Sequence, residues 1–231
     1  MGKKKITIII CSYNNSSYLK ECLKSVFDQS VSNNWFDVIL VDDKSSDESF
    51  EIANYFKDKK NFIIIKNKKN IGLVKSCNKA IKYVKTDFMV RVDSDDYVSK
   101  NFVKVFLKNI EKGYEFILSN YTIVTNNRLK RINIKKFRFK DLISCSVALK
   151  IEIINKIGGY NNFLWEEYDL YIRYLRKSKK IFRTKKYLYF YRLHKTNMTK
   201  LSSWKKRAWK QLFKRHEKKV LEDLERSIAL L

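Results

Sequence analysis

The chain of 231 residues is long enough for one medium-sized domain that buries its core without disulfides or structural metals. A hydrophobic content of 45% with 14% aromatic residues excludes wholesale disorder, although 50 Lys and Arg against 24 Asp and Glu give a net charge of +26. This excess points to an anionic partner, while a biased coding composition explains part of it equally well.

The first hundred residues alternate between apolar strand patterns and helical spacing. In chain order they predict strand 5–11, helix 18–29, strand 36–41, helix 47–56, strand 62–65, helix 73–84 and strand 87–92. Such an order is typical of a parallel α/β sheet with right-handed crossovers and helices on both faces.

The second half is less regular and predicts a mixed extension of the sheet. Its expected elements are helix 100–112, strand 115–124, a turn at 126–127 and strand 145–149. From Ser202 onward, apolar residues recur at helical spacing among many Lys and Arg residues, which predicts one long helix over 202–231. We therefore expect a domain over 1–200, followed by a basic amphipathic helix over 201–231.

Membrane spans and signal peptides are not predicted. The N-terminal apolar run covers only residues 6–11, and no later run reaches the about 18 apolar residues that a membrane span requires. We expect a cytoplasmic protein, with peripheral attachment to the inner face of the membrane as an open alternative. The cysteines lack the paired spacing of a zinc site and are interpreted as buried thiols. They are Cys11, Cys22, Cys77 and Cys145.

Three carboxylates, Asp93, Asp95 and Asp96, directly follow the fourth predicted strand and are separated only by Ser94. Like charges this close repel one another unless a cation neutralises them, so the cluster predicts a divalent metal site. Its place supports this prediction, because ligands of open α/β sheets collect beyond the carboxyl ends of the strands. An acidic surface turn is the alternative that this short pattern leaves open.

Polar motifs also follow the other strands of the first half. They are Cys11-Ser12-Tyr13-Asn14, Asp42-Asp43 and the loop that runs from Asn70 to Asn78. In order and spacing, over about residues 5–195, these motifs and the acidic cluster resemble the family 2 glycosyltransferases. The resemblance implies a GT-A fold and an inverting hexosyl- or N-acetylhexosaminyl-transferase, with a nucleotide-binding half over 1–100 and an acceptor half over 101–200.

The resemblance implies that the first half binds the nucleotide. Tyr13 offers a ring that can stack on uracil, and Asp43 offers an acceptor for the imide N–H of that base. Asp42 supports Asp43 or reaches the ribose, or else it is only a turn carboxylate. The complete set expected to bind the nucleotide is Cys11, Tyr13, Asn14, Asp42, Asp43, Gly72, Lys75, Asn78, Asp93 and Ser94.

The loop before the third helix is expected to approach the ribose or the phosphates. Gly72 permits a close approach of the backbone, and Lys75 supplies positive charge. Many relatives carry Arg directly before the residue that matches Asn78, but Cys77 stands there in this chain. Lys75 is therefore the expected cation.

The resemblance further implies that Asp95 binds Mn²⁺ or Mg²⁺ at the diphosphate, where the metal offsets charge on the departing group. Asp93 is expected to contact the ribose or to reach the metal through water. Near the end of the domain, His194 is expected to bind the metal or a phosphate, and Arg192 to clamp the diphosphate. Gly159, Trp165, Glu166 and Arg192 form the set expected on the diphosphate and acceptor side.

The general base is expected in Trp165-Glu166-Glu167, which follows a Gly-Gly-Tyr motif. Glu167 occupies the position of the family's catalytic Asp, and the helix dipole is expected to keep its carboxylate ionised. The alternative is that Glu166 and Glu167 only favour the start of a helix.

Function is predicted as metal-assisted transfer from a nucleotide sugar to a hydroxyl of a glycan or lipid-linked acceptor, as in polysaccharide biosynthesis. Uridine diphosphate is the favoured donor nucleotide, and thymidine and guanosine donors stay open. The basic C-terminal helix is expected to meet an anionic membrane or to pack on the domain. The competing classes are a nucleic-acid-binding protein and a noncatalytic membrane-associated relative; no nucleic acid is expected, because no zinc-finger or RNA-recognition signature is present.

Overall fold

The computed structural model describes residues 4–125, 128–134, 142–143, 145–194, 197 and 202–229, with the backbone alone for 202–205 and 227–229. A mixed sheet runs through the molecule with the strand order β3-β2-β1-β4-β8-β6-β9-β5, and β7 pairs with β6 beside this path. The turn predicted at 126–127 lies outside the described residues.

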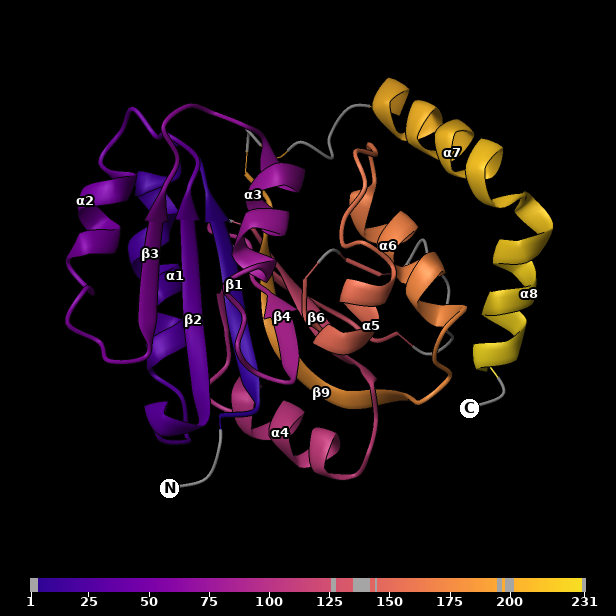
Figure 1. Ribbon diagram of the computed structural model, residues 1–231, viewed down its shortest axis with the longest axis horizontal. Coiled ribbons are helices and arrows are strands. Elements are labelled where there is room, and N and C mark those ends of the chain that lie inside the picture. Colours follow the sequence, from indigo (N-terminus) through magenta and orange to yellow (C-terminus); the bar gives the residue numbers. More distant parts are fainter. Residues whose placement is uncertain are drawn as a thin grey trace.

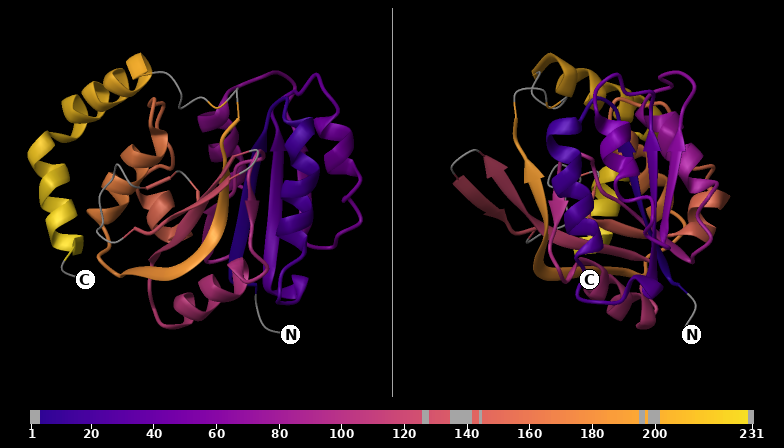
Figure 2. Two further views of the ribbon diagram at one scale, coloured as in Figure 1. Left: turned by 180° about the vertical axis from the view of Figure 1, so that it is seen from behind. Right: turned by 90° about the vertical axis from the view of Figure 1, so that its left-hand side faces the viewer.

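The first half forms the parallel part of the sheet, as the sequence predicted. Pairing is parallel between β1 and β2, between β1 and β4, and between β2 and β3. Figures 1 and 2 show α1 and α3 on opposite faces of these strands. The elements are β1 (Ile6–Ser12), α1 (Ser16–Phe27), the short helix Asn33–Trp35, β2 (Phe36–Asp42), α2 (Ser49–Asn54), β3 (Phe62–Lys66), α3 (Leu73–Ile81) and β4 (Phe88–Arg91).

The second half extends the sheet with strands of both directions. β8 is antiparallel to β4 and β6, whereas β9 is parallel to β6 and antiparallel to β5. The long strand β9 thereby returns the chain to the acidic cluster. The elements are β5 (Tyr97–Val98), α4 (Phe102–Glu111), β6 (Phe116–Thr125), β7 (Arg128–Ile132), β8 (Val147–Lys150), α5 (Ile151–Lys156), α6 (Glu166–Leu175) and β9 (Ile181–Arg192).

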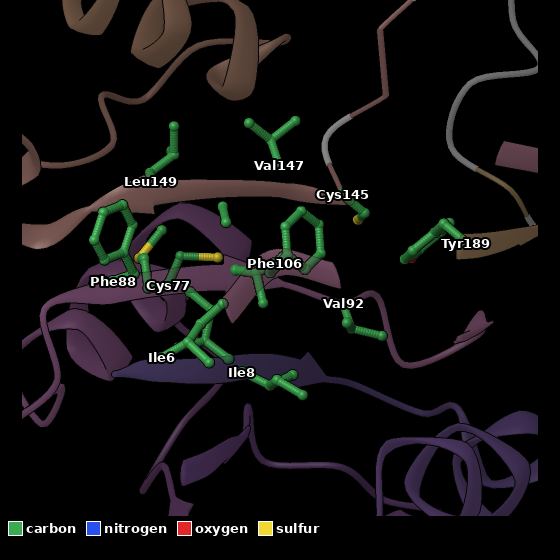
Figure 3. Close-up of a cluster of buried hydrophobic side chains, with 14 of the residues drawn as sticks. Ile6, Ile8, Cys77, Phe88, Val92, Phe106, Cys145, Val147, Leu149 and Tyr189 are labelled. Carbon is green, nitrogen blue, oxygen red and sulfur yellow. The ribbon is translucent and has the colours of Figure 1, made fainter. Parts of the chain in front are cut away.

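The hydrophobic core joins the two halves beneath the strand ends. Figure 3 shows part of it, in which Ile6 and Ile8 of β1 lie with Phe88 of β4 and with Val147 and Leu149 of β8. All five side chains are buried. Burial of each such side chain stabilises the fold by about 1.5–3 kcal/mol. The packed core therefore supports the polar loops that follow the strands at the carboxyl edge of the sheet.

The C-terminal segment forms two helices, α7 (Ser202–His216) and α8 (Lys218–Ala229), so the prediction of one long helix is wrong. Glu217, between them, has a left-handed φ of 58°. Leu212 and Leu221 are both buried, but in one straight helix, at about 100° per residue, they would point in opposite directions. The break turns α8 so that both helices pack beside α6 (Figure 1).

Candidate active site

A pocket of about 490 Å³ lies at the carboxyl edge of β1, β2 and β4. It joins the loops of the first half to the start of α6 and to the segment after β9. The predicted site residues that line it are Cys11, Tyr13, Asn14, Asp43, Gly72, Asp93, Ser94, Asp95, Trp165, Glu166, Glu167 and His194. Residues from both halves of the chain thus share one cavity.

Tyr13 and Asp43, which are expected to bind the nucleotide base, both line the pocket. Tyr13 is 48% exposed, so a face of its ring is accessible to a base. Asp43 is buried, and its Oδ1 accepts hydrogen bonds from the backbone of Ile71 and from the Asn67 amide, at 2.9 and 2.8 Å. Its Oδ2 accepts one from Gly72 N at 2.8 Å. A carboxylate oxygen accepts two hydrogen bonds, so Oδ2 can hold the loop and also meet a ligand.

The loops after β1 and β2 are tied together beside this position. Asn14 adopts a left-handed φ of 52°, and its Oδ1 accepts a hydrogen bond from Ser46 N at 2.8 Å. Asn15 donates to Ser94 Oγ at 2.7 Å, which links the first loop to the acidic cluster. These contacts fix Tyr13 relative to the carboxylates.

Cys11 differs from the other cysteines because it lines the pocket, whereas Cys22, Cys77 and Cys145 are buried. Its Sγ lies 3.5 Å from Cys77 Sγ. The hydrogen bond with Cys77 and burial raise the pKa of Cys11 well above its usual value. The thiol therefore stays protonated and presents a small, weakly polar surface to the pocket.

Asp42 and Lys75 do not reach the pocket lining. Asp42 is fully buried, and its Oδ2 accepts a hydrogen bond from Ser45 N at 3.3 Å, so the alternative of a turn carboxylate fits it better than contact with a ribose. Lys75 is exposed on α3, and the pocket is instead lined by Ser76 of that helix. The expected cation of this loop is therefore not at the cavity.

Asn78 and Gly159 do not line the pocket, and they lie against each other instead. The Asn78 side chain accepts a hydrogen bond from Tyr160 N at 2.9 Å and donates to Tyr160 O at 2.8 Å. Gly159 has a φ of +71°, and a Cβ there would lie 2.5 Å from Asn78 Oδ1. The Gly158-Gly159-Tyr160 motif is thus joined to α3 by hydrogen bonds, and these contacts have a structural role outside the pocket lining.

Asp95 and His194 both line the pocket and are in direct contact, with Asp95 Oδ2 and His194 Nε2 2.8 Å apart. Tyr18 stacks on the His194 ring at 4.7 Å between centroids. Burial and the Asp93 carboxylate raise the pKa of Asp95. Carboxylate oxygen and imidazole nitrogen are ligands that Mn²⁺ accepts, so the two residues fit a divalent cation that also needs ligands from a donor or water.

Asp96 has a structural position beneath this pair. It is 1% exposed, and its oxygens accept hydrogen bonds from the Tyr189 hydroxyl at 2.6 Å and from Arg192 N at 2.7 Å. Asp93, Asp96 and Cys145 also lie close enough to hold an ion. Asp96 already accepts these two hydrogen bonds and does not line the pocket. Asp95 and His194, which do line it, are therefore better placed to hold a metal there.

Arg192 stabilises the loop of the acidic cluster instead of lining the pocket. Its guanidinium donates to Asp95 O at 3.0 Å and pairs with Glu21. The same group lies over the rings of Tyr18 and Tyr97, at 5.2 and 4.8 Å. The expected clamp on the diphosphate is thus replaced by a support for Asp95.

Arg91 is a pocket residue that the sequence analysis missed. It is 5% exposed, and its guanidinium donates to Asp93 Oδ1 at 2.7 Å and to Glu166 Oε1 at 2.8 Å. A charged residue within the apolar strand β4 was the available signal, because a buried charge needs partners. Arg91 thus links the acidic cluster after β4 to the start of α6.

The other lining residues were not singled out from the sequence: Ser12, Asn70, Leu73 and Ser76 lie inside the quoted motifs without an assigned role, and the rest lie outside them. The complete set is Ser12, Asn15, Asn70, Leu73, Ser76, Leu164, Tyr191 and Asn197.

Glu167 differs from the expectation of a carboxylate kept ionised by a helix dipole. It is 9% exposed at the start of α6, and burial followed by the Glu166 carboxylate raises its pKa well above the usual value, with Arg91 acting in the opposite direction. Burial therefore outweighs the dipole. Because Arg91 engages Glu166, the two neighbouring glutamates have different environments.

The sequence comparisons agree with this geometry. Residues 7–171 match the profile of glycosyl transferase family 2, so the chain belongs to that family. The poly(ribitol-phosphate) beta-glucosyltransferase of Bacillus spizizenii is 34% identical over 142 residues. The match covers 59% of this chain but only 21% of that relative, so this chain spans about a fifth of its length.

Solved structures show the same fold. The Staphylococcus aureus TarS fragment 1–349 in complex with UDP-GlcNAc superimposes with a TM-score of 0.74 at 23% identity, covering 84% of this chain and 60% of that one. The mannosyltransferase PcManGT of Pyrobaculum calidifontis, in complex with GDP-Man and Mn²⁺, gives a TM-score of 0.68 at 12% identity, with 85% and 59% covered. The expected GT-A fold is confirmed.

Proposed function

We propose that this chain is an inverting glycosyltransferase that moves a sugar from a nucleotide diphosphate donor to a hydroxyl of a glycan or lipid-linked acceptor. The observation that carries the proposal is one pocket lined by the nucleotide motifs, the acidic cluster and the paired glutamates. A nucleic-acid-binding function gives no reason for the buried carboxylates of Asp43, Glu166 and Glu167 in the lining of a pocket.

The donor is proposed to be a uridine diphosphate sugar. Exposed Tyr13 supplies a stacking face, and Asp43 Oδ2 supplies an acceptor for an imide N–H. Two TarS structures of the same fold contain UDP-GlcNAc or UDP, which supports this choice. Thymidine and guanosine donors are the alternatives that a donor panel must include.

The proposed reaction is one displacement. Glu167 takes the proton of the acceptor hydroxyl, and the acceptor oxygen attacks the anomeric carbon. The bond from that carbon to the diphosphate breaks, and its electron pair leaves with the nucleoside diphosphate. Arg91 holds Glu166 and Asp93 in fixed positions, so that Glu167 faces the acceptor space. Attack from the side opposite to the leaving group inverts the configuration.

Asp95 and His194 are proposed to hold a divalent cation, Mn²⁺ or Mg²⁺. When bound, such a cation supplies positive charge that stabilises the departing diphosphate. Tyr18 and Arg192 keep the two ligands in place through ring stacking and a hydrogen bond to the backbone of Asp95.

A donor panel tests the proposal. UDP-GlcNAc, UDP-glucose, GDP-mannose and a thymidine diphosphate sugar are incubated with the protein and Mn²⁺, and the release of nucleoside diphosphate is measured. We expect hydrolysis or transfer with a uridine donor. Absence of turnover and of calorimetric binding for every donor contradicts the proposal and favours a noncatalytic relative.

We further propose that the protein is cytoplasmic and binds anionic membranes through the outer face of α7. That helix contains no Asp or Glu, and its exposed side chains include Lys206, Arg207, Lys210 and Lys214. Within the described residues, no helix is both long and apolar enough to cross a membrane. Trp209 packs on Trp165 and Leu212 is buried, so these apolar side chains of α7 face the domain and the proposed attraction is mainly electrostatic.

Exchanging Lys210 and Lys214 for Glu is expected to release the protein from anionic vesicles, because each basic residue contributes about 1 kcal/mol near such a surface. Sedimentation with phosphatidylglycerol and phosphatidylcholine vesicles at low and high salt measures the bound fraction. Lys57→Glu with Lys60→Glu is the matched control, since these exposed residues follow α2 at the opposite side of the molecule (Figure 1). Equal binding of both double variants contradicts the proposal.

A further inference from the structure

The inner face of α7 lies against the segment that leads into the catalytic helix. This segment, residues 161–165, carries Leu164 and Trp165 of the pocket lining and is followed directly by Glu166 and Glu167. Figure 1 shows α7 beside α6. The family profile matches residues 7–171, and α7 follows this range in the chain.

Two contacts connect α7 with the end of the segment. Gln211 Oε1 accepts a hydrogen bond from Leu164 N at 3.0 Å. The rings of Trp209 and Trp165 meet edge to face, with centroids 4.9 Å apart and planes at 79°. Trp165 is thus packed between the cavity and α7, and the backbone before it is fixed by a side chain of the same helix.

A buried carboxylate connects α7 with the beginning of the segment. Asp169 of α6 is fully buried, and its Oδ2 accepts a hydrogen bond from Asn161 Nδ2 at 2.9 Å. His216, the last residue of α7, places Nε2 2.8 Å from Asp169 Oδ1. Arg215 lies 3.3 Å from the same oxygen and also covers the Phe163 ring at 5.2 Å. Both ends of the segment are therefore held by α7, one directly and one through Asp169.

We infer that Trp209, Gln211 and His216 are positioning residues, which fix the acceptor wall of the pocket and the start of α6 from a helix that follows the residues matched by the family profile. None of the three lines the cavity. Trp209 acts through Trp165, Gln211 through the backbone of Leu164, and His216 through Asp169 and Asn161. The part of the inference that concerns turnover rests on the proposed function, whereas the part that concerns the placement of the segment does not.

Gln211→Met tests the inference, because Met keeps the length of the side chain and removes the acceptor oxygen. Gln211→Glu retains an acceptor, and Lys219→Gln on the exposed side of α8 is the matched control. Three quantities are measured for each variant: hydrogen exchange of the peptide that contains Leu164, the affinity for UDP by calorimetry, and kcat for hydrolysis of UDP-GlcNAc with Mn²⁺, in which water replaces the acceptor.

We expect faster exchange at Leu164 in Gln211→Met and a fall in kcat of about 10-fold to 100-fold, the size that a small misplacement of reacting groups produces. The affinity for UDP stays within about twofold of the parent, and Gln211→Glu recovers both the exchange protection and kcat. Unchanged exchange at Leu164 overturns the inference. A parallel loss of UDP affinity and kcat also overturns it, because the whole site then depends on α7.

Failure of the proposed function is distinguishable in the same experiment. If the parent protein hydrolyses no nucleotide sugar, the proposed activity is wrong, and the exchange measurement alone decides whether α7 positions the segment.

Discussion

Glu167→Gln is expected to reduce turnover by about 100-fold to 10,000-fold, the usual contribution of a general base. The amide keeps the shape of the side chain and cannot accept a proton. The affinity for UDP is expected to stay near that of the parent, since Glu167 is proposed to act on the acceptor hydroxyl and lies at the start of α6, apart from Tyr13 and Asp43 in the chain. Steady-state kinetics with the best donor of the panel, together with calorimetry, measure both quantities.

The dependence on pH provides an independent test of the same residue. Because burial and Glu166 raise the pKa of Glu167, activity should rise with pH at higher values than an ordinary glutamate requires. This limb of the profile should disappear in Glu167→Gln. An unchanged pH limb in the variant would assign the titration to another group.

The raised pKa also predicts how stability depends on pH. Since the folded-state pKa of Glu167 lies above that of the unfolded chain, the folded protein binds more protons between the two values. The contribution of this group to stability is therefore complete below the unfolded pKa and is lost as pH rises through the folded pKa. Glu167→Gln should be at least as stable as the parent at neutral pH, so loss of activity cannot be attributed to unfolding.

Glu166 and Asp169 are the rival carboxylates, and the structure gives each another partner. Glu166 is paired with Arg91. Although burial opposes it, hydrogen bonds from His216 and Arg173 lower the pKa of Asp169. Glu166→Gln and Asp169→Asn are thus expected to alter placement and stability more than proton transfer. Parent-like turnover of Glu167→Gln, with loss in either rival, would show that the base is misassigned.

The order of elements in the first half was predictable because each strand and helix there is a local pattern. Apolar runs such as 36–41 and helical spacing such as 73–84 need no information from distant residues. The observed helices end one to three residues earlier, for example α3 at Ile81. The predicted mixed sheet in the second half is likewise confirmed.

Features that depend on tertiary contacts were not predictable. β5 has two residues and exists because Tyr97 and Val98 pair with β9. The helix breaks at Glu217, between α7 and α8. The break allows His216 to contact Asp169 and Leu221 of the next helix to be buried as well. A local amphipathic pattern shows only that a segment is helical, and it does not show which of two faces a neighbouring helix will cover.

The candidate site shows the same division. Motif residues at strand ends, such as Tyr13 and Asp43, lie at the pocket because the carboxyl ends of parallel strands meet. Lys75 and Asn78 lie on other sides of α3 than Leu73 and Ser76, which line the cavity, because successive residues of a helix are rotated by about 100°. Arg91 was missed because it interrupts an apolar strand and its partners come from distant parts of the chain.

Asp95→Asn is expected to remove the dependence of UDP binding on Mn²⁺. The variant loses a negative ligand, while Asn keeps a hydrogen-bonding group beside His194. Outer-shell partners of a metal contribute about 10-fold to 100-fold in affinity, and a direct ligand should contribute at least as much. Calorimetry of UDP with Mn²⁺ and with EDTA measures the difference, and electron paramagnetic resonance of Mn²⁺ measures metal binding separately from turnover.

Asp28→Asn is the matched control for this prediction, because Asp28 is exposed after α1 and pairs with Lys100 away from the pocket. It should retain the parent's response to Mn²⁺. The parent protein must bind UDP more tightly with Mn²⁺ than with EDTA, because Asp93 and Asp95 otherwise place two carboxylates beside an anionic ligand. Equal affinity of the parent under both conditions would mean that Arg91, which lines the pocket, balances the diphosphate without a metal, and the roles assigned to Asp95 and His194 would be wrong.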